Sequence, residues 1–203
     1  MNWERAEEKF LLSLNTPQKI QNYLDSLIYN PTDHCSSPRF VMITGEGHCL
    51  EGGLVAAAAL ELQGFKPLMI DLVAERDDHH VITVYKAPSG WGSFSKSNTT
   101  LLRGRSPVYR TIRELVMSYF DFYFNTEGQL SLYSYSDPIN LNRFNKWNWR
   151  TSDEDLMEMG MSFCDLTHYE VTSIRHLKKL PKVSETLKSA CFLGANPEGL
   201  YKP

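Results

Sequence analysis

The sequence predicts an α+β protein in which helices pack on a small antiparallel sheet. Helical patterns come first, a helix followed by three strand patterns comes next, and further helical patterns follow. The turn Ala-Pro-Ser-Gly at 87–90 is too short to connect parallel strands, so it requires antiparallel pairing. With 203 residues, of which 42% are hydrophobic, the chain can bury one sizeable core. We expect a single domain over 1–203, with its core at about 39–125, a helical amino-terminal extension at 1–38 and an aromatic-rich carboxy-terminal region at 126–203.

The amino-terminal extension contains two predicted helices. Residues 3–14 form the first, and Thr16-Pro17 begins the second, because threonine caps helices well and proline fits their first position. Asn30-Pro31 ends the second helix. The apolar residues 40–43 then predict a short strand.

An alanine-rich helix over 50–63 is the strongest pattern in the chain, and Gly64 is placed to end it. Outside one apolar stripe, the faces of this helix carry valine, alanine and glycine instead of charge, so we expect the helix to be buried nearly all round. Segments 68–74 and 81–85 are dense in β-forming residues and predict buried strands, and Trp91 begins a third strand. Apolar residues recur every four positions along the helix: Leu50, Leu54, Ala58 and Leu62.

Weaker patterns predict four further elements. Ser106-Pro107 opens a surface helix that ends near Asn125. Residues 129–135 alternate polar and apolar side chains, as a half-exposed strand does. The acidic segment 151–155 has the residues of a capped helix start, and 184–192 predicts the last helix.

Charge and cysteine content exclude several classes of function. Lys and Arg number 21 against 24 Asp and Glu, which gives a net charge of −3 and no basic footprint for nucleic acid. The longest apolar run, 54–60, is too short to cross a membrane. The start MNWERAEEKF lacks the apolar stretch of a signal peptide, so we expect a cytoplasmic protein with four free thiols. The oligomeric state stays open.

Cys49 is the most informative position, because it follows Gly45-x-Gly47 and directly precedes the buried helix. The positive end of the helix dipole and the nearby N–H groups favour a thiolate there, and the thiolate is the nucleophile. The backbone N–H of Cys49 is also placed to stabilise the oxyanion of a tetrahedral intermediate. The alternative is a small buried residue at a tight turn.

His79 and His80 supply a candidate base at the start of the second predicted strand. Strand alternation sends only one of them inward. His80 shares a face with Ile82 and Val84, the more apolar face, so we favour His80 as the residue that faces the cysteine helix. The choice between the two histidines stays open, and a surface histidine pair is the alternative.

A third group that orients the base is expected from the strand that begins at Trp91. Ser95, Ser97 and Asn98 lie there, and each can accept a hydrogen bond from an imidazole, although none is a carboxylate. An ordinary polar strand end is the alternative interpretation of this cluster.

Together these motifs resemble the transglutaminase-like (papain-like) cysteine superfamily. The resemblance covers about 39–98, and 91–125 also looks like uncharacterised bacterial proteins placed near this superfamily. In the superfamily a cysteine starts the core helix, a histidine lies on one strand and an aspartate on the next. The matching features are Gly45-Glu46-Gly47-His48-Cys49, the alanine-rich helix, Gly64-Phe65-x-Pro67, the following strand, the histidine and the tryptophan-bearing strand.

The resemblance implies a cysteine-peptidase-like core and a thiol enzyme, free of cofactors, that acts on an amide or other acyl bond of a small molecule or peptide. Cys49 would be the nucleophile and His80 the base. Ser95 stands where the family has aspartate, and Asn98 could replace it, as an amide does in papain-like proteases. The superfamily includes amide hydrolases, acyl transferases and inactive binding modules, so a non-catalytic binding module is the alternative function.

A metal site is a competing interpretation of the same segments. His48, Cys49 and Glu51 form one group of Zn²⁺-type ligands, and 77–80, with two aspartates and two histidines, forms another. Adjacent residues cannot easily all reach one ion, and no standard ligand spacing appears. The sequence therefore predicts no metal site.

Overall fold

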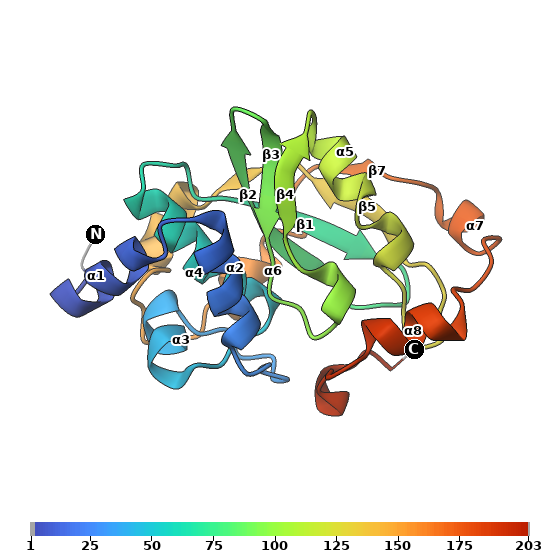
Figure 1. Cartoon of the computed structure of the whole chain (residues 1–203), viewed down its shortest axis with the longest axis horizontal. Helices are drawn as coiled ribbons and strands as arrows, with labels where there is room; N and C mark the ends of the chain where they lie inside the picture. Colours follow the sequence, from blue (N-terminus) through green and yellow to red (C-terminus); the bar gives the residue numbers. More distant parts are fainter. Residues whose placement is uncertain (1–2, 203) are drawn as a thin grey trace.

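The protein folds around one antiparallel sheet, as the computed structural model of the chain shows (Figure 1). The structure describes residues 3–202. The seven strands follow the order β4-β3-β2-β1-β5-β7, with β6 also paired to β1, and every pairing is antiparallel. The predicted α+β class with an antiparallel sheet is confirmed, although the sheet is larger than expected. Its strands are β1 (Leu68–Ala74), β2 (His80–Ala87), β3 (Gly90–Phe94), β4 (Arg105–Tyr109), β5 (Leu132–Ser136), β6 (Ile139–Asn140) and β7 (His168–Glu170).

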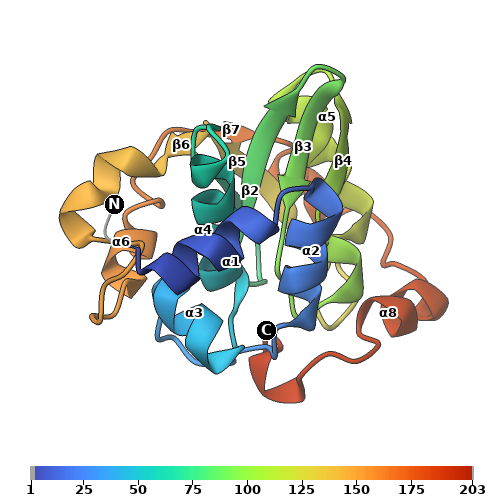
Figure 2. The ribbon, with the colours of Figure 1, turned by 60° about the vertical axis from the view of Figure 1, so that its left-hand side comes forward.

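Helices cover the two faces of the sheet unequally. Figure 2 shows α1, α2 and α3 gathered around α4 on one side, whereas α5 packs on the opposite face. Over residues 3–202, no helix has the length and apolar content that a membrane span requires. The helices are α1 (Arg5–Ser13), α2 (Pro17–Ser26), α3 (Pro38–Thr44), α4 (Cys49–Leu62), α5 (Ile112–Met117), α6 (Met157–Met161), α7 (Ile174–Leu177) and α8 (Glu185–Cys191), with short 3₁₀ turns η1 (Thr100–Leu102), η2 (Phe120–Phe122), η3 (Leu141–Trp147) and η4 (Pro197–Gly199).

Strand alternation divides the interior into two apolar layers. On β2, Val81 and Tyr85 belong to the layer that packs around α4, whereas Ile82 and Val84 belong to the layer that includes α5. Both faces of β2 are thus covered, which explains why this strand is apolar along almost its whole length.

The α4 helix is the centre of the first layer. Every residue from 50 to 60 is buried, as the lack of charge on its faces predicts. Glycines let neighbours approach closely: Gly52 lies against Lys96, and Gly53 lies against Met69. The Thr83 hydroxyl on β2 donates a hydrogen bond of 2.6 Å to the carbonyl of Gly53, so helix and strand are joined directly.

Most predicted elements with a clear cap or turn are confirmed. The Thr16 side chain accepts a hydrogen bond from the Lys19 N–H at the start of α2, as the Thr-Pro pair predicts. The 87–90 turn joins β2 to β3, with Ala87 paired to Gly90. The first and last predicted helices correspond to α1 and α8.

The strand predicted at 40–43 is wrong, because these residues lie within α3. The helix is favoured by Pro38 at its first turn and by Gly45, which adopts a left-handed conformation (φ 70°) just beyond its end. A run of apolar residues as short as this one does not distinguish a strand from a helix, so the flanking residues decide.

The long helix predicted from Ser106-Pro107 to Asn125 is wrong at both ends. Pro107 lies in β4, an edge strand, where a missing N–H is tolerated. The helix α5 starts only after Thr111, whose side chain accepts a hydrogen bond from the Glu114 N–H, and it ends at Met117.

The acidic segment 151–155 does not begin a helix. Asp155 Oδ1 instead accepts hydrogen bonds from the N–H groups of Cys35 and Met157, both at 2.9 Å, and α6 starts at Met157. The carboxylate therefore ties the α6 start to a distant loop.

Gly52→Ala is expected to destabilise the protein more than Gly53→Ala. A Cβ at position 52 meets the Cβ of Lys96, which cannot move without its backbone, whereas a Cβ at position 53 meets the flexible Met69 methyl group. Overpacking costs about 1–3 kcal/mol, against about 1 kcal/mol gained from the better helix propensity of alanine. Urea unfolding midpoints of the two variants measure the difference. A Gly52→Ala protein as stable as wild type would contradict close packing at this position.

Candidate active site

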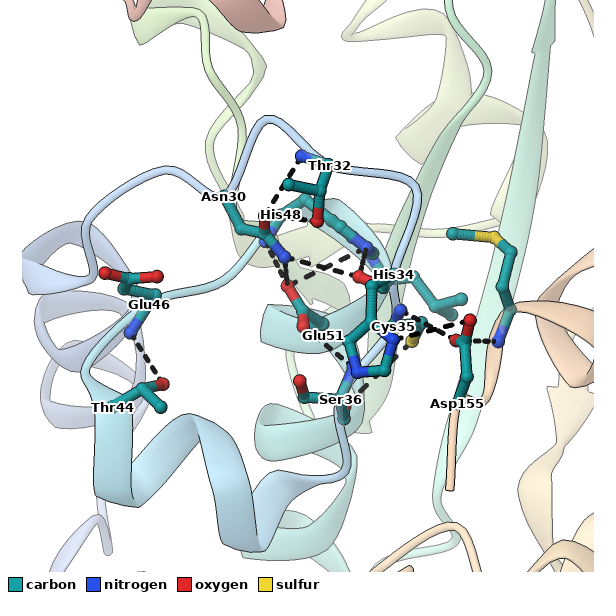
Figure 3. A network of polar contacts seen from close by, with 12 residues as sticks. Asn30, Thr32, His34, Cys35, Ser36, Thr44, Glu46, His48, Glu51 and Asp155 are labelled. Carbon is teal, nitrogen blue, oxygen red and sulfur yellow. Dashed lines mark hydrogen bonds and ion pairs between the residues drawn. The ribbon is translucent and has the colours of Figure 1, made fainter. Parts of the chain in front are cut away.

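A buried hydrogen-bond network fixes the start of α4 (Figure 3). The Glu51 carboxylate accepts hydrogen bonds from the N–H groups of His48 and Ser36, both at 2.8 Å, and from the Asn30 amide at 3.0 Å. Glu51 is only 1% exposed, so these donors replace its lost water. The helix start and the loop at 30–36 are thereby held together.

His48 caps α4 through its side chain. Its Nδ1 accepts a hydrogen bond from the Leu50 N–H at 3.2 Å, so Nε2 carries the hydrogen that it donates to the His34 carbonyl at 3.2 Å. Burial lowers the pKa of His48, which keeps this ring neutral and able to accept. Both ring nitrogens are therefore used in positioning the helix start.

Cys49 is the first residue of α4, and its partly buried thiol lines two cavities. Burial raises the pKa of this thiol to about 11, although the N–H groups of Val81 and Leu50 hydrogen-bond the sulfur and lower it. The effect of desolvation on the thiol pKa is thus larger than that of the N–H groups at the helix start, which the sequence predicts to favour a thiolate. The Cys49 thiol is therefore protonated at neutral pH.

His80 makes a short hydrogen bond to Ser95. Ser95 Oγ donates to the Leu102 carbonyl at 2.6 Å, so it accepts from His80 Nε2–H at 2.7 Å. This leaves Nδ1 as the basic nitrogen. Burial lowers the pKa of His80 to about 4. The Leu102 carbonyl raises this pKa and the charge of Arg105 lowers it, but burial has the largest effect. The ring is therefore neutral at pH 7.

The face of β2 that carries His80 turns to the opposite side of the sheet from the one expected. His80 shares its side of the strand with Ile82 and Val84, which pack in the α5 layer, so the expectation that this face turns towards the cysteine helix is wrong. An apolar face indicates burial, but both faces of β2 are buried. His80 nevertheless lies at the end of the strand, where it lines the same cavity of about 70 Å³ as Cys49.

That cavity also contains Tyr123, whose ring meets His80 edge-on with centroids 6.4 Å apart. The Tyr123 hydroxyl donates to the Asp78 carbonyl at 2.6 Å, which holds the loop before β2. Within residues 3–202, no hydrogen bond joins Cys49 to His79 or His80. The thiol and the base therefore share a cavity without a hydrogen bond between them.

Asn98 is not the hydrogen-bond partner of His80. Its amide instead donates to the Asn196 carbonyl at 2.9 Å and accepts from the Asn196 N–H at 2.8 Å. These bonds secure a segment that places Gly199, Leu200 and Tyr201 along both cavities next to Cys49. Asn98 therefore holds this segment in place and also lines the smaller cavity itself.

The larger cavity, of about 620 Å³, also borders Cys49 and has an acidic lining. His79, which is exposed, lines both cavities, and Ser97 lines the smaller one. The charged residues of the larger cavity are Asp33, Asp71, Asp78 and Glu198, with Lys202 as the one lysine or arginine among the described lining residues. Its excess of carboxylates favours a cationic or neutral ligand over an anionic one.

Polar groups in both of the candidate sets of metal ligands weighed in the sequence are used in other contacts. His48 and Glu51 use their polar atoms in the network around the α4 start. Asp77 accepts a hydrogen bond from Ser131 Oγ at 2.7 Å, and burial raises the pKa of this carboxyl to about 6.

Compared with models of known protein families and with curated protein sequences, the chain matches none.

Sequence reasoning missed several residues around Cys49. Tyr29, Asp71 and Cys164 come from segments far apart in the chain, and no spacing links them. Glu51 is different, because its position three residues after His48 is the spacing of a capping box.

Alkylation of Cys49 by iodoacetamide is expected to be slow at neutral pH and to keep accelerating up to about pH 10, because the thiol pKa lies above its ordinary range. Peptide mapping by mass spectrometry separates Cys49 from the other three thiols. A Cys164→Ser background removes the competing exposed thiol. A rate that levels off near neutral pH would show an activated thiolate and contradict the dominance of burial.

Acidification should destabilise the protein through His80. The pKa of His80 falls from 6.5 to about 4 on folding, so its contribution to stability is present above pH 6.5 and is lost as the pH falls towards 4. The loss is about 3 kcal/mol by order of magnitude. Urea unfolding of wild type and His80→Gln at each pH isolates this contribution. Folding raises the pKa of Asp77, so this carboxyl stabilises the protein on acidification, but that effect is common to both proteins. Parallel pH curves would show that His80 does not titrate in this way.

Proposed function

We propose that the protein is a transglutaminase-like thiol enzyme that acts on an amide or other acyl bond. The observation that carries the proposal is the cavity that Cys49 and His80 share, together with the hydrogen bond from His80 Nε2–H to Ser95. The order along the chain supports the same assignment. The cysteine begins the buried helix, the histidine begins the second strand, and the serine follows the third.

The reaction would begin from a neutral pair. As the Cys49 sulfur attacks the substrate carbonyl carbon, its proton passes to His80 Nδ1, and a thioester forms when the leaving amine or alcohol takes that proton. Water or another acceptor then cleaves the thioester. Substrate binding has to bring sulfur and Nδ1 into hydrogen-bond reach, because catalytic contacts are often made only in the complex.

Ser95 limits the rate of acyl transfer that Cys49 and His80 can reach. Its hydroxyl accepts from His80 in either charge state of the ring, which fixes the orientation. It carries no negative charge, so it stabilises the imidazolium less than a carboxylate would. We therefore expect slow acyl transfer, with orientation as the main contribution of Ser95.

A non-catalytic binding module is the second candidate. The raised pKa of the Cys49 thiol favours it, because a protonated thiol is a weak nucleophile. The acidic cavity beside Cys49 would then be a ligand site in which the thiol only lines the wall.

Mixing the protein with p-nitrophenyl acetate tests the proposal. Enzyme-like reactivity predicts a burst of about one p-nitrophenolate per chain and one acetyl group on Cys49, detected by intact mass and peptide mapping. Loss of the base in His80→Gln should slow the burst by about 100-fold or more. Ser95→Ala should slow it less, with Ser95→Thr restoring part of the rate.

Two variants serve as controls. His34→Ala should keep the burst rate of a folded wild type, because the exposed His34 lines neither of the two cavities next to Cys49. Cys164→Ser removes an exposed thiol that could be acetylated without any base. A burst that persists in Cys49→Ala, or that is unchanged in His80→Gln, would reject the Cys49–His80 pair and favour the binding module.

A further inference from the structure

Three side chains of metal-binding type converge on the wall of the larger cavity. Asp71 comes from β1, His79 from the loop before β2 and Cys164 from the turn between α6 and β7. One ligand atom from each lies within 4.8 Å of the other two, the one such group that residues 3–202 contain. Neither group of ligands considered from the sequence includes Asp71 or Cys164.

The three ligand types fit a borderline-soft divalent cation. Zn²⁺ accepts carboxylate oxygen, imidazole nitrogen and thiolate sulfur at about 2.0–2.3 Å in tetrahedral geometry, with neighbouring ligand atoms roughly 3.3–3.8 Å apart. The three atoms here would have to draw together by at most about 1.5 Å. His79 and Cys164 are exposed and lie outside regular elements, so their side chains can make this adjustment.

Asp71 supplies the rigid part of the group. It is 3% exposed, lies in the middle of a central strand, and its N–H donates to Ser136 Oγ at 3.0 Å. Its Oδ2 lies 3.0 Å from His168 Nε2, while His168 Nδ1 lies 2.8 Å from the Leu166 carbonyl. Such an outer partner orients a ligating carboxylate.

The cavity leaves room for a fourth ligand. Asp71, His79 and Cys164 all line the space of about 620 Å³ that also reaches Cys49, and three protein ligands with one open position are typical of a reactive zinc site. The other carboxylates of the cavity, Asp33, Asp78 and Glu198, add attraction for a cation.

We propose that Asp71, His79 and Cys164 bind a divalent transition-metal ion of the zinc type, which occupies the acidic cavity beside Cys49. Binding forms a metal–sulfur bond at Cys164, and the thiol proton is released to solvent. A water molecule or a ligand group completes the tetrahedron.

Cobalt titration of the metal-free, reduced full chain tests the proposal. With Co²⁺ alone as the probe, one equivalent should give a near-ultraviolet thiolate-to-cobalt charge-transfer band and the visible bands of tetrahedral cobalt, and Zn²⁺ should abolish both. Cys164→Ser should remove the charge-transfer band, and His79→Ala should weaken binding by at least about 10-fold. Both substitutions are at exposed positions, so the variants are expected to fold.

Matched controls locate the site. His34→Ala removes another exposed histidine, and Cys49→Ala removes the other thiol of the cavity, so both should retain the cobalt spectrum. His168→Gln should weaken binding about 10-fold without removing the charge-transfer band. The proposal fails if cobalt gives no tetrahedral spectrum, if the band follows Cys49 and not Cys164, or if none of the variants changes it. Since Cys49→Ala abolishes acylation but retains the metal, the two proposals can fail separately.

Discussion

The close contact between α4 and the strands beside it is the constraint on which the rest of the structure depends. The helix can approach β2 and β1 only because Gly53 presents no side chain, and it can approach Lys96 only because Gly52 presents none. The same approach puts the first turn of α4 beside the start of β2. Cys49 and His80 therefore share a cavity because of backbone packing, before any bond between their side chains is made.

The sequence predicts those parts of the fold that local physics decides. The α4 helix is recognisable because its pattern is long, and β2 with β3 because a short turn permits only one pairing. Residues 40–43 are too few to reveal a period. The helix expected after Pro107 fails because sheet pairing outweighs an apolar helical pattern at β4. Neither the addition of β5 and β7 to the sheet nor the order of its strands follows from local patterns.

The candidate site is predictable to a similar degree. Cys49, His80 and Ser95 lie within one stretch of about fifty residues, where local patterns indicate Cys49 and leave His79 and His80 open, while the family resemblance points to Ser95; the structure joins His80 and Ser95 by a hydrogen bond. Electrostatics was not predictable, because the pKa of the Cys49 thiol depends on how completely it is desolvated. Asp71 and Cys164 were missed because only the folded sheet brings β1 next to the turn after α6.

The strand alternation at the start of β2 gives His79 and His80 opposite surroundings. His80 is buried beside Ser95, whereas His79 is exposed next to Asp71 and Cys164. An alignment of related sequences that slides this segment by one position would therefore compare residues of different chemistry. Related chains should be aligned on the apolar residues 81–85 of β2, because their alternation defines the two faces of the strand. A relative with only one histidine here would then reveal which of the two environments it has kept.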